Sequence, residues 1–186
     1  MKTFSFCMAL IAFLFSTQTV QAQIISPQSK VLVAYYSRSG NTAEIARQIQ
    51  TATGADIFEI IPAEPYPEDY RQTTEQARKE IAEGYLPALK NQIDNLEQYD
   101  VIFIGSPCWW GTIASPVSSF LSAYDFSGKT VIPFMTHGGS GLGHGVEDIR
   151  KLIPSAEVAD GRAFLGTGAS LAAIDVNNWI KGMKND

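Results

Sequence analysis

The sequence has few of the residues that disulfides and metal sites require. Only two of its 186 residues are cysteines, and Cys7 lies in a hydrophobic N-terminal stretch that is typical of a cleaved signal, so Cys108 has no intrachain partner. Only two are histidines, His137 and His144, and no third metal ligand lies near them in the sequence. A disulfide-stapled domain and a zinc centre are therefore both disfavoured.

The motifs of several common enzyme classes are also missing. Neither the phosphate loop G-x-x-x-x-G-K-[ST] nor the dinucleotide fingerprint G-x-G-x-x-G is present. A cysteine phosphatase of the C-x5-R type would need arginine in place of Ala114, and a serine hydrolase built on Ser140 would need glycine in place of Leu142. These two activities stay as minor alternatives, beside a metal site at the histidines.

The sequence has fewer basic than acidic residues: 14 Lys and Arg against 19 Asp and Glu, which gives a net charge of −5. A chain of this charge is not expected to bind nucleic acid or an anionic membrane by electrostatic attraction. Many of the acids fall between Glu59 and Glu83. Such a segment is typical of a solvated helix face, and it is also a surface that could steer a basic redox partner.

The first residues form a separate unit. Lys2 precedes an apolar run, Phe4 to Phe15, that is too short to span a bilayer, and Val20-Gln21-Ala22 has the A-x-A pattern of a cleavage site. The pattern predicts a signal peptide over residues 1–22 and a single domain over residues 23–186. We expect an exported protein, periplasmic or secreted, with no stable membrane insertion after cleavage.

The stretch from residue 31 to residue 54 predicts a strand, a polar loop and a helix. Val31 to Tyr36 is a continuous apolar run, typical of a strand buried in a parallel sheet. Asn41 is predicted to cap the helix, with Glu44 completing a capping box and Gly54 ending the helix. A small polar loop between a parallel strand and a helix is an anion site, so we expect the loop over residues 37–42 to cradle a phosphate.

Further strands are predicted at 55–61, 101–105, 130–135 and, weakly, 158–165. The strand at 55–61 is expected to be buried, like the strand at 31–36. Helices are predicted over 71–84, from an N-cap at Ser115, over 146–153 and after a cap at Asp175. Strands that alternate with helices predict an α/β fold, a doubly wound five-stranded parallel sheet in the order 2-1-3-4-5 with helices on both faces. In that order the loops after strands one, three and four meet at one edge, where ligands of such sheets bind.

The two other loops at this edge favour a flat ligand. The loop after the third strand carries the adjacent tryptophans Trp109 and Trp110, one of which is expected to stack on an aromatic ring and the other to pack inward. The loop over residues 136–145 carries five glycines, which let backbone N–H groups approach a ring edge. Together with a phosphate cradle, these features describe flavin mononucleotide (FMN).

The Ser37-Arg38-Ser39-Gly40-Asn41-Thr42 segment resembles the phosphate loop of flavodoxins, and the segments over 64–67, 107–112 and 136–141 resemble matching parts of a short-chain flavodoxin-like family. The resemblance implies FMN as the cofactor and electron transfer as the role, with a redox partner protein or a small electron acceptor. The alternatives are an FMN-dependent NAD(P)H:quinone-type oxidoreductase and a flavodoxin-like binding protein that has lost FMN. The resemblance places the phosphate at Ser37, Arg38, Ser39, Gly40, Asn41 and Thr42, and the ring at Pro107, Cys108, Trp109, Trp110, Gly111, Thr136, His137, Gly138, Gly139 and Gly141.

A carrier is favoured over an enzyme for two reasons. The chain has no dinucleotide fingerprint and no second domain to hold a nicotinamide cofactor. Acid–base side chains near the expected ring are also few, since His137 and His144 are the only histidines. No catalytic residue is therefore predicted.

Overall fold

The computed structural model describes residues 24–184. The predicted signal peptide over residues 1–22 lies outside the described residues and stays a prediction. Within the described part of the chain, no helix is both long enough and apolar enough to cross a bilayer.

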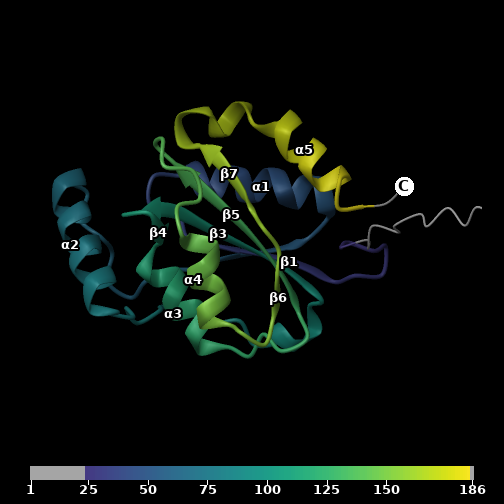
Figure 1. Ribbon diagram of the computed structural model, residues 1–186, viewed down its shortest axis with the longest axis horizontal. Coiled ribbons are helices and arrows are strands. Elements are labelled where there is room, and N and C mark those ends of the chain that lie inside the picture. The colour runs from purple at the N-terminus through teal and green to yellow at the C-terminus, as the bar shows by residue number, and fades with distance from the viewer. Residues whose placement is uncertain (1–23, 185–186) are drawn as a thin grey trace, which may run out of the picture.

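A parallel sheet forms the centre of the molecule (Figure 1). Its order is β2-β1-β3-β5-β6, and β7 also pairs with β5, so the predicted order is confirmed with two short strands in the fifth place. A small strand, β4, pairs antiparallel with the end of β3. The bounds are β1 (Val31–Tyr35), β2 (Asp56–Glu59), β3 (Val101–Trp109), β4 (Thr112–Ile113), β5 (Thr130–His137), β6 (Glu157–Val158) and β7 (Arg162–Leu165).

Helices cover both faces of the sheet. In Figure 1, α1 and α5 lie on one face, α3 and α4 lie on the other, and α2 stands at the side of the molecule. The bounds are α1 (Asn41–Thr53), α2 (Tyr70–Glu83), α3 (Ser115–Ala123), α4 (Gly145–Leu152) and α5 (Ala173–Lys181), with 3-10 turns at Leu96–Gln98 and Gly166–Leu171.

The sheet separates two hydrophobic cores, because successive side chains of a strand point to opposite faces. In β1, Val31, Val33 and Tyr35 belong to the core under α1 and α5, whereas Leu32 and Ala34 belong to the core under α3 and α4. Val33 and Ala34 are fully buried. The continuous apolar run of this strand therefore reflects burial on both faces.

The second strand departs from the prediction. It was expected to be buried, but β2 is an edge strand, and Asp56, Ile57 and Glu59 are exposed. Phe58 is half-buried and Ile60, just after the strand, is buried, so one face alone contacts the core. Glu59 places a charge on the open face of this edge strand, which is a common protection against pairing with another chain.

The outer strand beside β5, which consists of β6 and β7, is interrupted by a β-bulge. Val131 of β5 pairs with Val158 of β6, and Phe134 of β5 pairs with Arg162 of β7. The outer strand therefore uses one residue more than β5 over the same distance. The N–H of Ala159 donates to the carbonyl of Val131, and the next backbone position of β5 on that side is Pro133, which has no N–H to offer. The extra residue accommodates this missing donor.

Three predicted helix caps are wrong by one to three residues. Asn41, Ser115 and Asp175 were expected to be caps, but Asn41 and Ser115 are the first helical residues and Asp175 lies in the first turn. The caps are Gly40, Ala114 and Ala172, whose carbonyls accept the N–H groups of Glu44, Val117 and Val176. The predicted capping box does not form, because the Glu44 carboxylate is 2.6 Å from Arg47 and 3.0 Å from Gln48.

Candidate functional site

Three loops meet at the carboxyl edge of the sheet, as predicted. Because β1, β3 and β5 are neighbours in register, with Tyr35 beside Gly105 and Gly105 beside Phe134, the segments that follow them emerge side by side. The first loop joins β1 to α1, the second is the turn between β3 and β4, and the third joins β5 to α4. They are called loops one, two and three below.

Loop one has the backbone of an anion site. Gly40 adopts a left-handed conformation (φ 85°) and is the N-cap of α1, whose first N–H groups have no partner within the helix. The hydroxyl oxygen of Ser37 is buried and has no hydrogen-bond partner among the described residues. A buried hydroxyl without a partner is costly, so this atom fits a bound phosphate that would complete its hydrogen bonding.

The other side chains of loop one are already engaged. Thr42 is buried, and its hydroxyl is 2.8 Å from the hydroxyl of Thr136 in β5, which ties loop one to loop three. The amide nitrogen of Asn41 is 3.4 Å from the hydroxyl of Ser39. Arg38 points towards α2, where its guanidinium donates to the backbone carbonyls of Pro67 (3.1 Å) and Glu68 (2.6 Å).

Loop two is a two-residue hairpin turn. Cys108 pairs with Ile113 and Trp109 with Thr112, which leaves Trp110 and Gly111 as the turn, and both have positive φ, 52° and 83°. A two-residue turn with positive φ at both positions matches the twist of a hairpin. Trp110 is the only described residue other than glycine with a positive φ, so this turn holds a large aromatic side chain in a strained conformation.

The two tryptophans point in different directions, as the sequence predicted. Trp109 is half-buried and makes edge contacts with Tyr36 (centroids 5.6 Å apart) and Tyr66 (4.9 Å). Trp110 is 56% exposed, and its ring N–H donates to the carbonyl of Thr74 in α2 at 2.9 Å. Trp109 is thus the one that packs inward, and Trp110 presents its ring at the surface.

Loop three contacts loop two directly. The hydroxyl of Ser140 donates to the sulfur of Cys108 at 3.2 Å, and the N–H of His144 donates to the carbonyl of Gly111 at 2.7 Å. A Cβ atom on Gly143 would lie 2.0 Å from the oxygen of Gly111. Only glycine allows two backbone segments to approach this closely.

Glycines and a histidine fill the start of loop three. A Cβ atom on Gly138, Gly139 or Gly141 would meet nothing within 4 Å, so the loop leaves open space that a ligand edge can enter. The ring nitrogen Nδ1 of His137 accepts the N–H of Gly139 at 2.9 Å. His137 therefore shapes the loop around it.

An acidic side chain fixes the base of the hairpin. Asp148 in α4 accepts hydrogen bonds from Thr112 (2.7 Å) and Lys151 (2.9 Å), and its carboxylate is 2.5 Å from Nδ1 of His144. Burial raises the pKa of Asp148, but the hydrogen bonds from Thr112, Lys151 and His144 together outweigh burial and lower it to about 2. Asp148 is thus ionised at neutral pH and anchors β4 to α4.

A cavity of about 470 Å³ opens between loop one, loop two and α2. Six of the predicted cofactor-binding residues lie in its wall: Arg38, Ser39, Pro107, Cys108, Trp109 and Trp110. None of the predicted residues of loop three is among its wall residues, although loop three contacts loop two through Ser140 and His144. The volume is within the range of small-molecule sites.

Sequence reasoning missed the α2 side of this cavity. Tyr70, Thr73, Thr74 and Ala77 complete its wall, and their spacing of i, i+3, i+4 and i+7 is that of one helix face. This periodic signal was present in the sequence, but two threonines and an exposed tyrosine give it little hydrophobicity. Gly166 was missed too: a Cβ there would lie 2.9 Å from the side chain of Asn41, so the turn after β7 also borders loop one.

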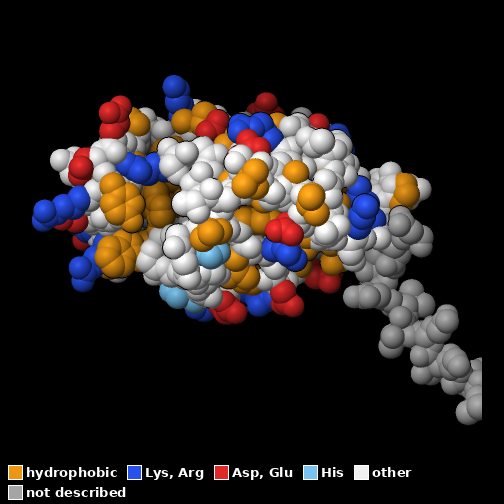
Figure 2. All heavy atoms as spheres, turned by 90° about the horizontal axis from the view of Figure 1, so that it is seen from above, with side chains coloured by type: hydrophobic (Ala, Val, Ile, Leu, Met, Phe, Trp, Pro, Cys, Tyr) orange, Lys and Arg blue, Asp and Glu red, His pale blue; other side chains and the backbone are white. Residues whose placement is uncertain are grey.

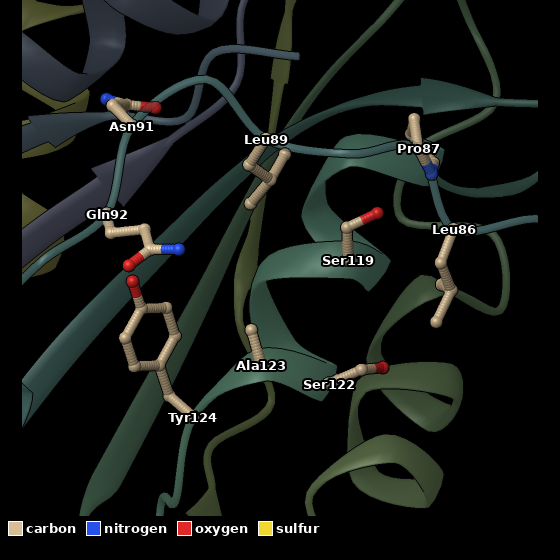
Figure 3. Close-up of a pocket in the computed structure, with 9 residues that line it drawn as sticks. All are labelled: Leu86, Pro87, Leu89, Asn91, Gln92, Ser119, Ser122, Ala123 and Tyr124. Atoms are coloured by element: carbon tan, nitrogen blue, oxygen red, sulfur yellow. The ribbon is translucent and has the colours of Figure 1, made fainter. Parts of the chain in front are cut away.

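A second cavity, of about 420 Å³, lies apart from these loops (Figure 3). It is formed by the segment around Leu86 and Leu89 and by the α3 end that carries Tyr124. The figure shows the hydroxyl of Tyr124 close to Gln92. No charged side chain and no residue of the three loops lines this cavity, so the candidate site remains at the carboxyl edge of the sheet.

Solved structures with the same fold include two proteins from Bacteroides that are described as flavoproteins. The one from Bacteroides uniformis is 34% identical, with a TM-score of 0.75, and the match covers 82% of this chain and 98% of that chain. The one from Bacteroides eggerthii is 32% identical, with a TM-score of 0.74, over 83% and 98%. A flavoprotein from Lactobacillus acidophilus, solved in complex with FMN, is 27% identical, with a TM-score of 0.62, over 77% and 97%.

The fold defines a doubly wound α/β protein in which the loops after β1, β3 and β5 meet at the carboxyl edge of its sheet. The family model described as flavodoxin matches residues 30–183, which is most of the chain. The chain belongs to the flavodoxin family, and the resemblance found in the sequence is confirmed.

Proposed function

We propose that this protein binds FMN and transfers electrons through it. The observation that carries the proposal is the buried hydroxyl of Ser37, which has no partner among the described residues and lies in the loop that leads into α1, in a chain of the flavodoxin family. A phosphate at this helix end would accept hydrogen bonds from the hydroxyl and from backbone N–H groups. The FMN complex of the Lactobacillus acidophilus relative supports the choice of flavin.

We assign different parts of FMN to different loops. Residues 37–42 would hold the phosphate, and residues 107–111 and 136–141 would hold the ring, where the glycines of loop three leave space. When bound, FMN supplies the redox chemistry, and the protein supplies binding, orientation and exclusion of water. Trp109 and Tyr66 form a rigid aromatic wall behind loop two, because each packs edge-on against the other.

Discrimination between FMN and riboflavin tests the phosphate site. We expect FMN to bind at least about 100-fold more tightly than riboflavin, because charge-assisted hydrogen bonds are each worth roughly 1.5–3 kcal/mol and two of them already give that ratio. Fluorescence-quenching titrations of both flavins measure the difference. Ser37→Ala should weaken FMN binding and leave riboflavin binding unchanged, and equal affinities of the unaltered protein for the two flavins would contradict the assignment.

The carrier role is tested by comparing two electron donors: a nicotinamide cofactor and a reduced partner protein. We expect NADH and NADPH to reduce the FMN-loaded protein slowly or not at all in stopped-flow mixing, because the chain carries no dinucleotide fingerprint. A chemically reduced redox partner protein should exchange electrons with it rapidly. Fast reduction by a nicotinamide cofactor, followed by many turnovers in the presence of quinone, would show that the protein is a reductase instead.

A reductase is the second candidate function. Six wall residues of the cavity between loop two and α2 are assigned to FMN, and Tyr70, Thr73, Thr74 and Ala77 of α2 supply a further wall. A small electron acceptor would need space of this kind beside the cofactor. The same stopped-flow experiment separates the two functions.

A further inference from the structure

A third cavity, of about 370 Å³, lies between α2, α3, α4 and β4. None of the residues assigned to FMN is among its wall residues. The buried residues of α2 are Thr73, Ala77 and Glu80, which are three or four positions apart and so lie on one helix face. The first two border the cavity beside loops one and two, and Glu80 borders the third cavity. One face of α2 therefore forms part of the wall of both.

The α3 side of the third cavity is a row of hydroxyl groups. Ser115, Ser118 and Ser122 all border it, and their spacing of i, i+3 and i+7 places them on one face of the helix. Ser115 is buried, Ser118 is half-buried and Ser122 is exposed. The row therefore runs from the interior of the protein to its surface.

The most buried of these hydroxyls lacks a hydrogen bond. Ser115 is 3% exposed, and its Oγ has no hydrogen-bond partner among residues 24–184. Burial and the hydrogen bond to Glu80 raise the pKa of Tyr66, and Ser115 counteracts this rise, so its hydroxyl lies near the phenol without good hydrogen-bond geometry. A buried hydroxyl without a partner is costly, so Ser115 fits a ligand that would complete its hydrogen bonding.

The charged groups of the third cavity disfavour a charged ligand of either sign. Glu80 is buried, and its two oxygens accept from neutral donors, Tyr66 at 2.5 Å and Gln76 at 2.8 Å. On the α4 side, Lys151 pairs with Asp148 at 2.9 Å. Glu80 would repel an anion, whereas a cation would meet Lys151 and the partial positive charge at the start of α3. A neutral ligand avoids both penalties.

The opening of the third cavity carries exposed apolar side chains. Tyr85 is 54% exposed, Leu86 is exposed as well, and both border the cavity. On the face that Figure 2 shows, acidic and basic side chains are mixed at the α2 end of the molecule, so the surface there favours neither charge. An exposed aromatic ring beside polar groups is suited to a ligand that has both C–H surface and hydroxyl groups.

We propose that the third cavity binds a small neutral polyhydroxylated molecule of the class and size of a monosaccharide. Each hydroxyl of such a ligand both donates and accepts hydrogen bonds, so it can pair with Ser115 and Ser118 and donate to the Glu80 carboxylate. Its C–H surface would lie against Tyr85. A volume of about 370 Å³ is within the range of small-molecule sites. This site does not depend on FMN and goes beyond the proposed function.

Sugars of one ring size and different charge test the proposal. The probes are glucose, galactose and mannose (neutral), glucosamine (cationic) and glucuronate (anionic), each titrated into the protein with excess FMN and followed by backbone amide NMR shifts. We expect at least one neutral sugar to bind, with shifts centred on residues 80–86 and 112–122. Glucuronate should bind at least about tenfold more weakly, because like charges repel across a contact. Glucosamine should bind no more tightly than the neutral sugars.

Matched serine variants of α3 separate binding from folding. Ser115→Ala should weaken the tightest sugar about fivefold, the loss of one neutral hydrogen bond. Its urea midpoint without sugar should not fall, because the Ser115 hydroxyl has no partner within residues 24–184. The control is Ser119→Ala: Ser119 is buried in the same helix, does not border this cavity and donates to the carbonyl of Ser115 at 3.2 Å. This control should leave sugar binding unchanged.

A variant of α2 tests the charge argument. Glu80→Gln keeps the size of the side chain and removes its charge, so it should narrow the difference between glucuronate and the neutral sugars. An unchanged difference would show that Glu80 does not select the ligand.

Three further results would overturn the proposal. Absence of binding by all three neutral sugars would reject the ligand class, and tighter binding of glucosamine would identify a site for cations instead. An unchanged sugar affinity in Ser115→Ala would show that this hydroxyl does not contact the ligand. A failure of the protein to bind FMN would reject the proposed function and not this site, because the same sugar titrations can be made without the cofactor.

Discussion

Replacing Gly143 by alanine is expected to weaken FMN binding by at least about tenfold, because it separates loop two from loop three. A Cβ at this position would lie 2.0 Å from the oxygen and 2.7 Å from the carbon of Gly111. Both are backbone atoms, so no side chain can move aside, and the two segments must part by more than 1 Å, a misplacement that costs a site roughly tenfold to 100-fold. The hydrogen bond from the His144 N–H to the Gly111 carbonyl would then be lost.

The matched control for this variant is Gly128→Ala, in the turn before β5 and outside the three loops. Gly128 also has a positive φ, 71°, against 54° for Gly143, but a Cβ on Gly128 would meet nothing within 4 Å. Alanine there costs about 1 kcal/mol through backbone strain alone. Comparing the two variants therefore separates the contact between loops from the strain.

FMN titration and urea denaturation of the cofactor-free protein measure the two effects separately. We expect Gly143→Ala to weaken FMN binding much more than Gly128→Ala does. If the two variants bound FMN equally, the contact between loops two and three would have no role in the site.

The centre of the sheet was predictable because a strand that is buried on both faces has a continuous run of apolar residues. The apolar runs in β1, β3 and β5 predicted the three central strands, and the alternation of strands and helices predicted a parallel sheet. The order 2-1-3-4-5, which the structure confirms, is that of flavodoxin-like sheets and does not follow from the alternation alone. The burial of the edge strand β2 was overestimated, because Ile57 and Ile60 resemble part of a buried run although one face of the strand is open. Apolar residues alone do not distinguish an edge from a centre.

Loop geometry was less predictable, because it depends on contacts between distant segments. Nothing near Asn41 in the sequence shows that Gly40 takes the cap position, since the side chain of Glu44 is drawn to Arg47 and Gln48. The close approach of Gly143 to Gly111 joins residues of two different loops. Glycines signalled that such an approach was possible, but they did not indicate which pairs would meet.

The acidic segment between Glu59 and Glu83 is mostly the solvated face that its composition predicted. Its acids are exposed except for Glu80, which is buried and accepts from the Tyr66 hydroxyl. A residue count over a helix adds up both faces, so it did not show that Glu80 lies on the inner one. The steering of a basic partner by this surface stays a prediction.

Replacing Gly105 by alanine is expected to destabilise the fold by about 3 kcal/mol, at the upper end of the cost of overpacking a core. Gly105 lies in β3 beside Phe134 of β5, and a Cβ there would lie 2.2 Å from the ring atom Cζ of Phe134, with two more ring atoms within 2.8 Å. Phe134 is fully buried, so its ring has little room to turn. The same two strands carry loops two and three, so their displacement should also weaken FMN binding.

The group that an alanine at position 105 would meet is the side chain of Phe134, which can itself be made smaller by substitution. Phe134→Leu alone should cost about 1–2 kcal/mol by leaving a cavity. In the double variant the alanine Cβ takes up part of that cavity, so the double variant should be more stable than the sum of the two single changes predicts, by about 1 kcal/mol or more. Gly138→Ala, where a Cβ would meet nothing within 4 Å, serves as the control and should change stability by less than about 0.5 kcal/mol.

Urea denaturation of the cofactor-free proteins gives these free energies, because FMN would otherwise stabilise each variant according to its affinity. Strict additivity of Gly105→Ala and Phe134→Leu would contradict the argument, since it would mean that the ring is not what excludes a side chain at position 105. A coupling of the expected sign would show that the close contact between β3 and β5 depends on a glycine opposite an aromatic ring. The spacing of loops two and three would then be set within the sheet, several residues before either loop begins.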